Sequence, residues 1–282
     1  MTAPDERPLP PPAPETFRYE ERERVGIITL DRPDRLNALT FAVYRELADF
    51  FTVVANRTLD PSGRGARALV LRGEGKGFCS GGDVEDIIGR LFERDAEGLL
   101  RFTRMTGELI EAMRLCPLPI VASVKRVAAG AGAVMALASD VRIVGEHAFF
   151  AFLFPQVGLS GADMGASYLL PRVVGLGHAT RILLTGERVE AKRAERIGLA
   201  TEVVADDPPE AVDEAAFAFA KRLADGPHFA LRMTKTMLQK ELDLPLPQAI
   251  EAEAQAQALC MMHPDFREAH DAWKEKRAPR FR

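Results

Sequence analysis

The chain has 282 residues and a formal net charge of −4. Hydrophobic residues make up 47% of it and charged residues 28%, as in ordinary globular proteins. The acidic balance argues against nucleic-acid binding, which would need a concentrated basic excess. No apolar stretch approaches the roughly 18 residues of a membrane-spanning helix, and the start does not resemble a signal peptide. Three cysteines without metal-ligand spacing suggest reduced thiols, so we expect a cytoplasmic protein with no membrane partner and no metal site.

The beginning of the chain is rich in proline. Residues 1–16 hold six of the nineteen prolines, which predicts a disordered or extended arm. From Phe17 onward the hydrophobic patterns predict strands alternating with helices. The predicted strands cover residues 17–20, 25–30, 67–71, 120–124, 141–144 and 148–152. The predicted helices cover 41–56, 99–115 and, rich in small residues, 132–139. This alternation predicts an α/β core domain with a mixed parallel sheet over residues 17–204.

The character of the chain changes after residue 204. Apolar residues then recur with helical spacing, which predicts four consecutive helices over 211–224, 228–242, 247–262 and 265–276. We therefore predict a C-terminal helical region over 205–282, and such a layer often packs between subunits.

Two turns rich in glycine and alanine each follow a hydrophobic run. The first, 77–83, follows the strand predicted at 67–71, and the second, 127–134, follows the strand predicted at 120–124. Small residues at such turns let backbone N–H groups approach a bound oxygen without obstruction by side chains. Two facing turns of this kind would make a two-donor oxyanion site, which stabilises an enolate or a tetrahedral oxyanion.

These turns belong to a set of segments that resembles a known family. The set comprises residues 31–39, 77–83, 119–140, 184–199 and 275–281, so that the likeness covers about residues 17–282. In this order the chain resembles the crotonase (enoyl-CoA hydratase/isomerase) superfamily. The resemblance implies a spiral of repeated ββα units with a C-terminal helical trimerisation region, and a homotrimer or dimer of trimers. It also implies an acyl-CoA substrate, with coenzyme A as part of the substrate and no separate cofactor.

The resemblance assigns the oxyanion donors and the coenzyme A contacts to particular residues. The donors would be the backbone N–H groups of Gly82 and Ala131, where the family usually has a glycine at the second position. Backbone groups of Asn37, Ala38 and Leu39 would contact the adenine. Arg35 and Lys276, the latter from the same or a neighbouring subunit, would meet the phosphates as cations. Ordinary solvated side chains are the alternative for both charges.

Two departures from the family pattern concern proton transfer. Hydratases of this family use two glutamates, as base toward water and acid toward the α-carbon, but this chain has Val134 and Phe154 at those positions. Neither side chain transfers protons, so the two-glutamate mechanism does not carry over. Both would instead line an apolar acyl pocket that suits an aromatic or bulky acyl group.

One carboxylate stands near these positions. Asp163 matches the catalytic base of dienoyl-CoA isomerases and equally the nucleophile of 4-chlorobenzoyl-CoA dehalogenases. Its structural alternative is an N-cap for a helix that begins at Met164. Glu111, on the helix predicted over 99–115, is a second catalytic candidate, with an ordinary helix-surface glutamate as the alternative. Asp83 is interpreted as a residue that fixes the first turn.

Three functional hypotheses therefore stay open. The first is enoyl-CoA hydration or isomerisation, with a thioester enolate in the oxyanion hole and Asp163 as the acid/base. The second is aryl-CoA or β-dicarbonyl hydrolase or dehalogenase-like chemistry using Asp163, although the helix over 99–115 lacks the histidine that assists hydrolysis in the dehalogenases. The third is a CoA-binding homologue without catalytic activity.

Overall fold

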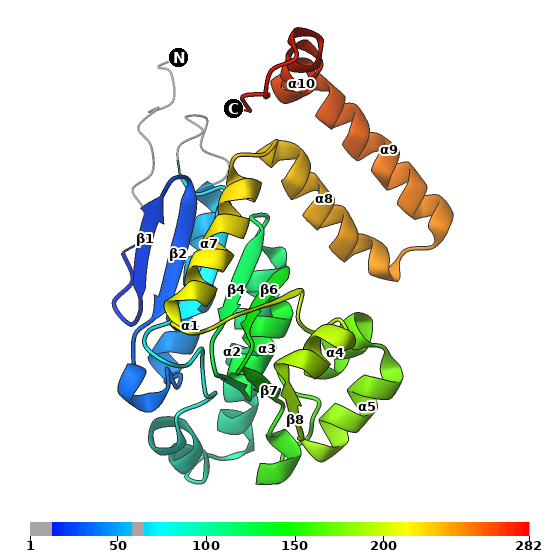
Figure 1. Cartoon of the computed structure of the whole chain (residues 1–282). Coiled ribbons are helices and arrows are strands. Elements are labelled where there is room, and N and C mark those ends of the chain that lie inside the picture. The colour runs from blue at the N-terminus through cyan, green and yellow to red at the C-terminus, as the bar shows by residue number, and fades with distance from the viewer. Residues whose placement is uncertain (1–12, 58–64, 282) are drawn as a thin grey trace, which may run out of the picture.

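A parallel sheet with one antiparallel edge strand forms the centre of the molecule. The computed structural model describes residues 13–57 and 65–281 (Figure 1). The strands of the main sheet lie in the order β1-β2-β3-β4-β6-β9, with β1 antiparallel to β2 and the later pairs parallel. They are β1 (Arg18–Arg22), β2 (Val25–Leu30), β3 (Ala68–Gly73), β4 (Ile120–Val124), β6 (Val141–Gly145) and β9 (Glu202–Val204).

A smaller sheet completes the strand architecture. It holds β5 (Val127–Ala129), β7 (Phe149–Ala151) and β8 (Arg188–Glu190), with β5 parallel and β8 antiparallel to β7. The mixed α/β core predicted from the sequence is therefore confirmed. The strand expected over 148–152 is real but shorter than predicted.

Helices cover both faces of the main sheet. Every residue of β2 is buried, as expected for a parallel strand covered on both sides. Ile28 and Leu30 belong to a core beneath α1 (Phe41–Arg57) and α2 (Ala96–Leu115), whereas Val25 and Ile27 pack in a second core against α7 (Glu210–Ala224). The helices of this part are α1 (Phe41–Arg57), α2 (Ala96–Leu115), α3 (Ala131–Ala138), α4 (Ala166–Val174), α5 (Leu176–Thr185), α6 (Ala191–Arg196) and α7 (Glu210–Ala224).

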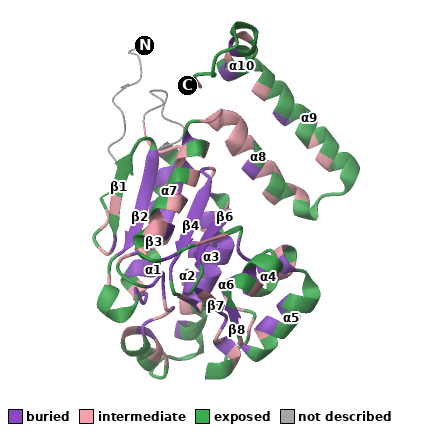
Figure 2. Ribbon diagram, viewed as in Figure 1, coloured by how far each residue is buried: buried purple, intermediate pink, exposed green. Residues whose placement is uncertain are grey.

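The C-terminal helices have different environments. α7 lies on the sheet, while α8 (His228–Lys240), α9 (Leu246–Met262) and α10 (Pro264–Glu275) lead away from it, and Figure 2 shows α9 and α10 mostly exposed. Lys235 fastens α8 to the core, because its Nζ donates to the Leu118 carbonyl oxygen at 2.8 Å and pairs with Asp140 at 2.7 Å. The four predicted helices are confirmed, and the domain boundary near residue 204 stays a prediction.

Three local features differ from expectation or extend it. α2 begins earlier than predicted, because the Asp95 side chain accepts from the Gly98 N–H at 2.8 Å and caps the helix. A turn of π-helix, Val84–Gly89, follows the first glycine-rich turn. The predicted arm over 1–16 lies mostly outside the described residues, but the N–H groups of Glu15 and Thr16 already donate to the Glu46 carboxylate. None of the helices in the described ranges 13–57 and 65–281 is long and apolar enough to cross a membrane.

Candidate active site

The two glycine-rich turns meet, as the sequence predicted. Bridges between Leu39 and Gly82 and between Cys79 and Ala128 hold the first turn against its neighbours. Gly81 has a φ of +102°, and a methyl group on it would lie 3.0 Å from the Ala129 carbonyl oxygen and 3.5 Å from the Ala131 amide nitrogen. Only glycine fits this conformation and this close approach. The second turn is therefore pressed directly against the first.

The N–H groups of Gly82 and Ala131 are the free donors at this junction. Gly82 is half-buried, and Ala131 is the first residue of α3. Their neighbours Asp83 and Gly130 donate to carbonyl oxygens at 2.9 and 2.8 Å, but neither Gly82 nor Ala131 N–H has an acceptor among the described residues. Unpaired N–H groups at a helix start favour a negatively charged oxygen. Both N–H groups therefore lie at the contact between the two turns, and their role as oxyanion donors stays a prediction.

Asp83 fixes the first turn, as predicted. Its Oδ1 accepts from the Glu85 and Asp86 N–H groups at 3.0 and 3.1 Å, and its Oδ2 lies 3.0 Å from the Arg32 guanidinium. The hydrogen bond from the Asp86 N–H, with the Glu85 bond and Arg32, lowers the pKa of Asp83. The carboxylate is therefore held charged and structural.

Asp163 lies on the loop before α4. The interpretation of Asp163 as an N-cap is wrong: α4 begins at Ala166 with Gly165 in the N-cap position. Within the described part of the chain, the carboxylate accepts only a 3.0 Å bond from the Met164 N–H, and Met164 has a φ of +49°. Burial raises the pKa of Asp163, and the Met164 bond offsets part of this effect. A half-buried carboxylate with a raised pKa is suited to accept and return a proton.

Tyr44 was not singled out by the sequence analysis. It projects from α1, its side chain is buried, and a methyl group on Gly82 would lie 3.7 Å from its hydroxyl oxygen. Burial raises the pKa of Tyr44, and Cys79 and Asp163 raise it further by charge interaction. The only sequence signal was a hydroxyl-bearing side chain on the apolar face of an amphipathic helix. Aromatic rings lie beside it, since Phe102 is 6.3 Å from Tyr44 and 5.4 Å from Phe41 between centroids.

The other predicted catalytic and acyl-pocket residues have distinct surroundings. Val134 is fully buried in the main core and Phe154 is 7% exposed. Glu111 is exposed on α2 and has no hydrogen bond or ion pair among the described residues. Its neighbour Ile110 faces the loop that carries Asp163, because a methyl group placed on Gly165 of that loop would lie 3.8 Å from the Ile110 side chain. The role predicted for Glu111 stays a prediction.

The turn expected to contact adenine is built mainly by internal hydrogen bonds. The N–H groups of Asn37, Ala38 and Leu39 already donate to carbonyl oxygens at 2.8–3.1 Å, and the Asn37 side chain joins two loops through Glu74 and Gly77. Base recognition here would therefore fall to carbonyl oxygens.

The two predicted phosphate contacts lie far apart within one chain. Arg35 is exposed and pairs with Glu85 at 3.3 Å, next to the adenine turn. Lys276 ends α10, which Figure 1 shows at the top of the molecule, whereas the loops after β2 and β3 are at its lower end. One chain does not bring Lys276 to Arg35.

One group of potential metal ligands occurs among the described residues: Glu146, His147 and Asp206. His147 Nδ1 lies 2.5 Å from Asp206 Oδ1, so an ion pair accounts for the arrangement. The pKa of His147 is raised by the Asp206 hydrogen bond and charge.

Comparison with known proteins supports the family resemblance. Residues 20–282 match the family model described as enoyl-CoA hydratase/isomerase. A "Probable enoyl-CoA hydratase" from Rhodobacter capsulatus is 40% identical over 94% of this chain and 97% of its own. The 1,2-epoxyphenylacetyl-CoA isomerase of Escherichia coli is 32% identical over 91% of this chain and 94% of its own.

A solved structure gives the same result for the fold. A candidate enoyl-CoA hydratase from Streptomyces coelicolor A3(2) superposes with a TM-score of 0.91 at 50% identity, covering 100% of this chain and 99% of that one. The predicted crotonase-type fold is confirmed. The chain belongs to the enoyl-CoA hydratase/isomerase family.

Proposed function

We propose that the chain binds acyl-CoA thioesters and catalyses enoyl-CoA hydration or isomerisation through a thioester enolate. The observation that carries this proposal is the pair of free amides at Gly82 and Ala131, held together by the close approach of Gly81. A thioester oxygen bound to both gains negative charge when a proton leaves the α-carbon or when water adds to the double bond. The two N–H groups would stabilise that charge more than they stabilise the neutral ester.

Asp163 supplies the proton transfer in this proposal. In isomerisation its carboxylate removes a proton from one carbon of the unsaturated acyl group, and the carboxyl group returns it to another. In hydration it removes a proton from water and returns it to the α-carbon. The pKa of Asp163, raised by burial, brings it toward working pH, where a base is both ionised and strong enough.

The acyl group in this proposal is bulky or aromatic. By the family resemblance, the buried apolar residues Val134 and Phe154 replace the glutamates of hydratases. Phe41 and Phe102 add aromatic rings beside Tyr44. The name of the Escherichia coli relative, a phenylacetyl-CoA derivative isomerase, supports an aromatic substrate class.

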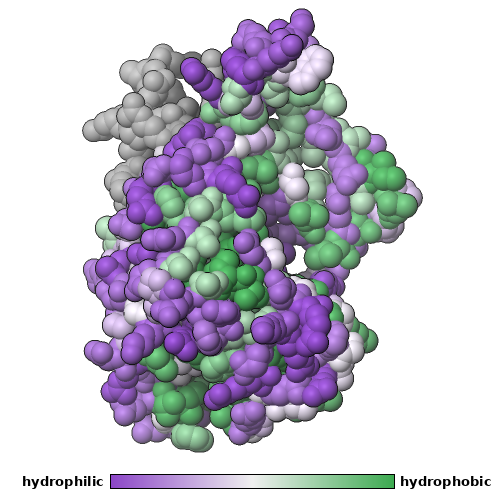
Figure 3. All heavy atoms as spheres, viewed as in Figure 1, coloured by the Kyte–Doolittle hydropathy of each residue, from purple (hydrophilic) through white to green (hydrophobic). Residues whose placement is uncertain are grey.

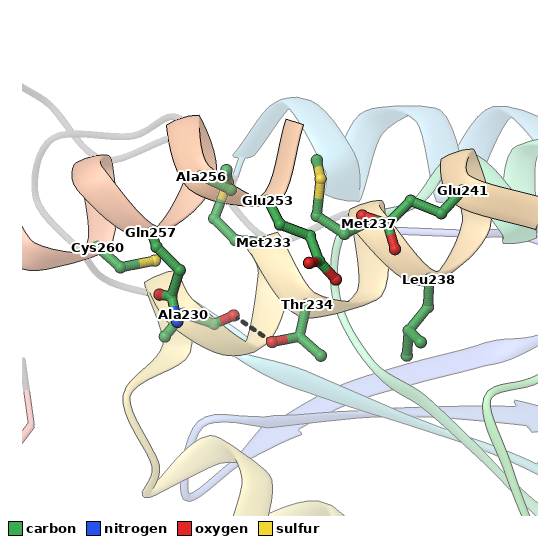
Figure 4. A pocket seen from close by; sticks show the side chains of 10 residues that line it. All are labelled: Ala230, Met233, Thr234, Met237, Leu238, Glu241, Glu253, Ala256, Gln257 and Cys260. Carbon is green, nitrogen blue, oxygen red and sulfur yellow. Dashed lines mark hydrogen bonds between the residues drawn. The ribbon is translucent and has the colours of Figure 1, made fainter. Parts of the chain in front are cut away.

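The assembly in this proposal is a homotrimer or a dimer of trimers. α8 and α9 enclose a groove of about 400 Å³ that is lined by methionine and leucine side chains with Glu241 and Glu253 (Figure 4). Figure 3 shows apolar side chains along α8 and α9, and Trp273 on α10 is 78% exposed. Large exposed apolar side chains of this kind mark protein interfaces. A neighbouring copy would bury them and would bring its Lys276 toward the coenzyme A site.

Replacement of Asp163 by asparagine tests the catalytic assignment. Asp163→Asn keeps the size of the side chain and should lower enoyl-CoA turnover at least 100-fold while acyl-CoA binding, measured by calorimetry, is retained. The matched control is Asp49→Asn on the exposed face of α1, which should leave turnover unchanged.

Other results would favour other hypotheses. Unchanged turnover in Asp163→Asn would remove Asp163 from the mechanism, and a parent protein that binds acyl-CoA without turning over any enoyl-CoA would favour the non-catalytic homologue. An ester between Asp163 and an aryl or acyl group, found by mass spectrometry of quenched reactions, would favour the hydrolase or dehalogenase hypothesis. Light scattering of the eluted protein measures the assembly, and a monomer would contradict the trimer.

A further inference from the structure

The Tyr44 side chain carries a hydroxyl group whose role the fold does not explain. The residue is 2% exposed, and its hydroxyl has no hydrogen bond to any residue that the structure describes. The aromatic ring alone would satisfy the packing against Phe102, so phenylalanine would serve the fold as well. A phenolic hydroxyl without a partner in the protein is available to donate a hydrogen bond to a ligand or to water.

The position of the hydroxyl identifies where that partner would be. It lies beside Gly82, whose free N–H is one of the two donors for the thioester oxygen. Asp163 is among the charges that raise the pKa of Tyr44, after burial and Cys79. The phenol thus stays protonated and is available as a donor beside the thioester site.

An apolar wall surrounds this donor. A methyl group on Gly82 would lie 3.7 Å from Ile87, the same distance as from the Tyr44 hydroxyl. The Phe102 ring lies edge-on to the Tyr44 ring. A purely hydrocarbon acyl group would therefore seal the hydroxyl in without an acceptor. An oxygen on the acyl group, or a water molecule about to join it, would give the hydroxyl its acceptor.

We infer that Tyr44 donates a hydrogen bond to the oxygen at the β-carbon, so that Tyr44 and Asp163 hold the attacking water of a hydration reaction and the hydroxyl of its product. The inference rests on the proposed function. It favours hydration over isomerisation, with 3-hydroxyacyl-CoA as the substrate of the reverse reaction. Double-bond isomerisation of a hydrocarbon enoyl group offers Tyr44 no oxygen.

The chemical step balances with these groups alone. Water, accepting from the Tyr44 hydroxyl, gives one proton to the Asp163 carboxylate as its oxygen forms a bond to the β-carbon. The electrons of the carbon–carbon double bond move onto the thioester oxygen at the two amides. The Asp163 carboxyl group then gives the proton to the α-carbon as the enolate collapses, so one water molecule is added and Asp163 returns to its ionised form.

The test compares two ligands that differ by one hydroxyl group. Binding of 3-hydroxybutyryl-CoA and butyryl-CoA is measured by calorimetry on the full chain, the parent against Tyr44→Phe. We expect Tyr44→Phe to lose about tenfold in affinity for the hydroxyacyl ligand and to bind butyryl-CoA equally or more tightly. Tyr19→Phe, the same change on β1, is the control and should alter neither affinity.

The outcomes separate this inference from the proposed function. Equal losses of affinity for both ligands would overturn it, because the hydroxyl would then donate to the thioester oxygen that both ligands share. No loss of affinity for either ligand, or no binding by the parent protein, would overturn it too. Kinetics add a second readout: Tyr44→Phe should hydrate trans-2-butenoyl-CoA about 10- to 100-fold more slowly with the Asp163 limb of its pH profile unmoved. If Asp163→Asn retains turnover but Tyr44→Phe still loses only the hydroxyacyl ligand, the proposed base is wrong and the inference about Tyr44 stands.

Discussion

Proline at position 131 would remove one oxyanion donor and little else. Ala131 is the first residue of α3, with Gly130 in the N-cap position, so its N–H makes no helical hydrogen bond. Proline is favoured at this first helical position, and the preceding Gly130 tolerates unusual backbone angles. The stability of Ala131→Pro should therefore stay within about 1 kcal/mol of the parent.

The kinetic effect should be much larger than the effect on stability. Loss of a single oxyanion donor lowers kcat by about 100- to 1,000-fold, or roughly 3–4 kcal/mol of barrier. The value should lie at the upper end here, because the Ala131 N–H is also the N-terminal group of a completely buried helix, where solvent screens little of its charge. The proline ring would moreover stand where the oxygen binds.

The assay is turnover of an enoyl-CoA by Ala131→Pro, together with its unfolding in denaturant. Ala96→Pro is the matched control, since Ala96 is the exposed first residue of α2, and it should leave both kcat and stability nearly unchanged. Ala131→Gly keeps the N–H and should retain turnover. A folded Ala131→Pro variant with kcat within threefold of the parent would refute the assignment of this amide.

Three further predictions concern single residues. Burial raises the folded-state pKa of Asp163, so its contribution to stability is present below the unfolded-state pKa and is lost as pH rises through the folded-state value. The melting temperature of Asp163→Asn should therefore lie above that of the parent near neutral pH and equal it below about pH 3. The pKa of Asp83 is lowered, first by the Asp86 N–H bond, so stability is present above its unfolded-state pKa and lost as pH falls; Asp83→Asn should lose about 1–3 kcal/mol at neutral pH in denaturant unfolding, and a loss under 0.5 would contradict the structural role. Gly132→Ala should lose more than about 2 kcal/mol of unfolding free energy in the same measurement, because its methyl group would meet a backbone carbonyl oxygen. Gly107→Ala, in the open middle of α2, should gain up to about 1 kcal/mol. Similar values for both variants would contradict the predicted close packing.

Much of the fold could be predicted because its signals are local. The alternation of apolar runs, glycine turns and amphipathic helices gave the order of the long elements, and α8 to α10 follow the predicted periodicity within a few residues. Short elements such as β8, α6 and β9 were not predicted, because segments of three to six residues carry too little periodicity. Their positions are decided by neighbours distant in the chain.

The site divides in the same way. The contact between the two glycine-rich turns could be predicted because small residues in sequence reveal where backbone must approach closely. The assignment of Gly82 and Ala131 as the donors comes from the family resemblance and stays a prediction. Tyr44 could not be found, since a tyrosine on an apolar helix face has the pattern of a core residue, and its nearness to Gly82 depends on how α1 packs. The remoteness of Lys276 within one chain likewise depends on the path of α9 and α10.

The raised pKa of Asp163 has a simple physical explanation. Asp163 is half-buried and has no ion pair among the described residues, so burial raises its pKa and no cation lowers it. A site with a pair of carboxylates tunes its base by repulsion between like charges, whereas an isolated carboxylate is tuned by desolvation alone. Its basicity then depends on how dry the pocket is, and an acyl group that expels water would strengthen the base as it binds. Bulky acyl groups should therefore show a higher kcat than short ones, and equal kcat values across chain lengths would contradict tuning by desolvation.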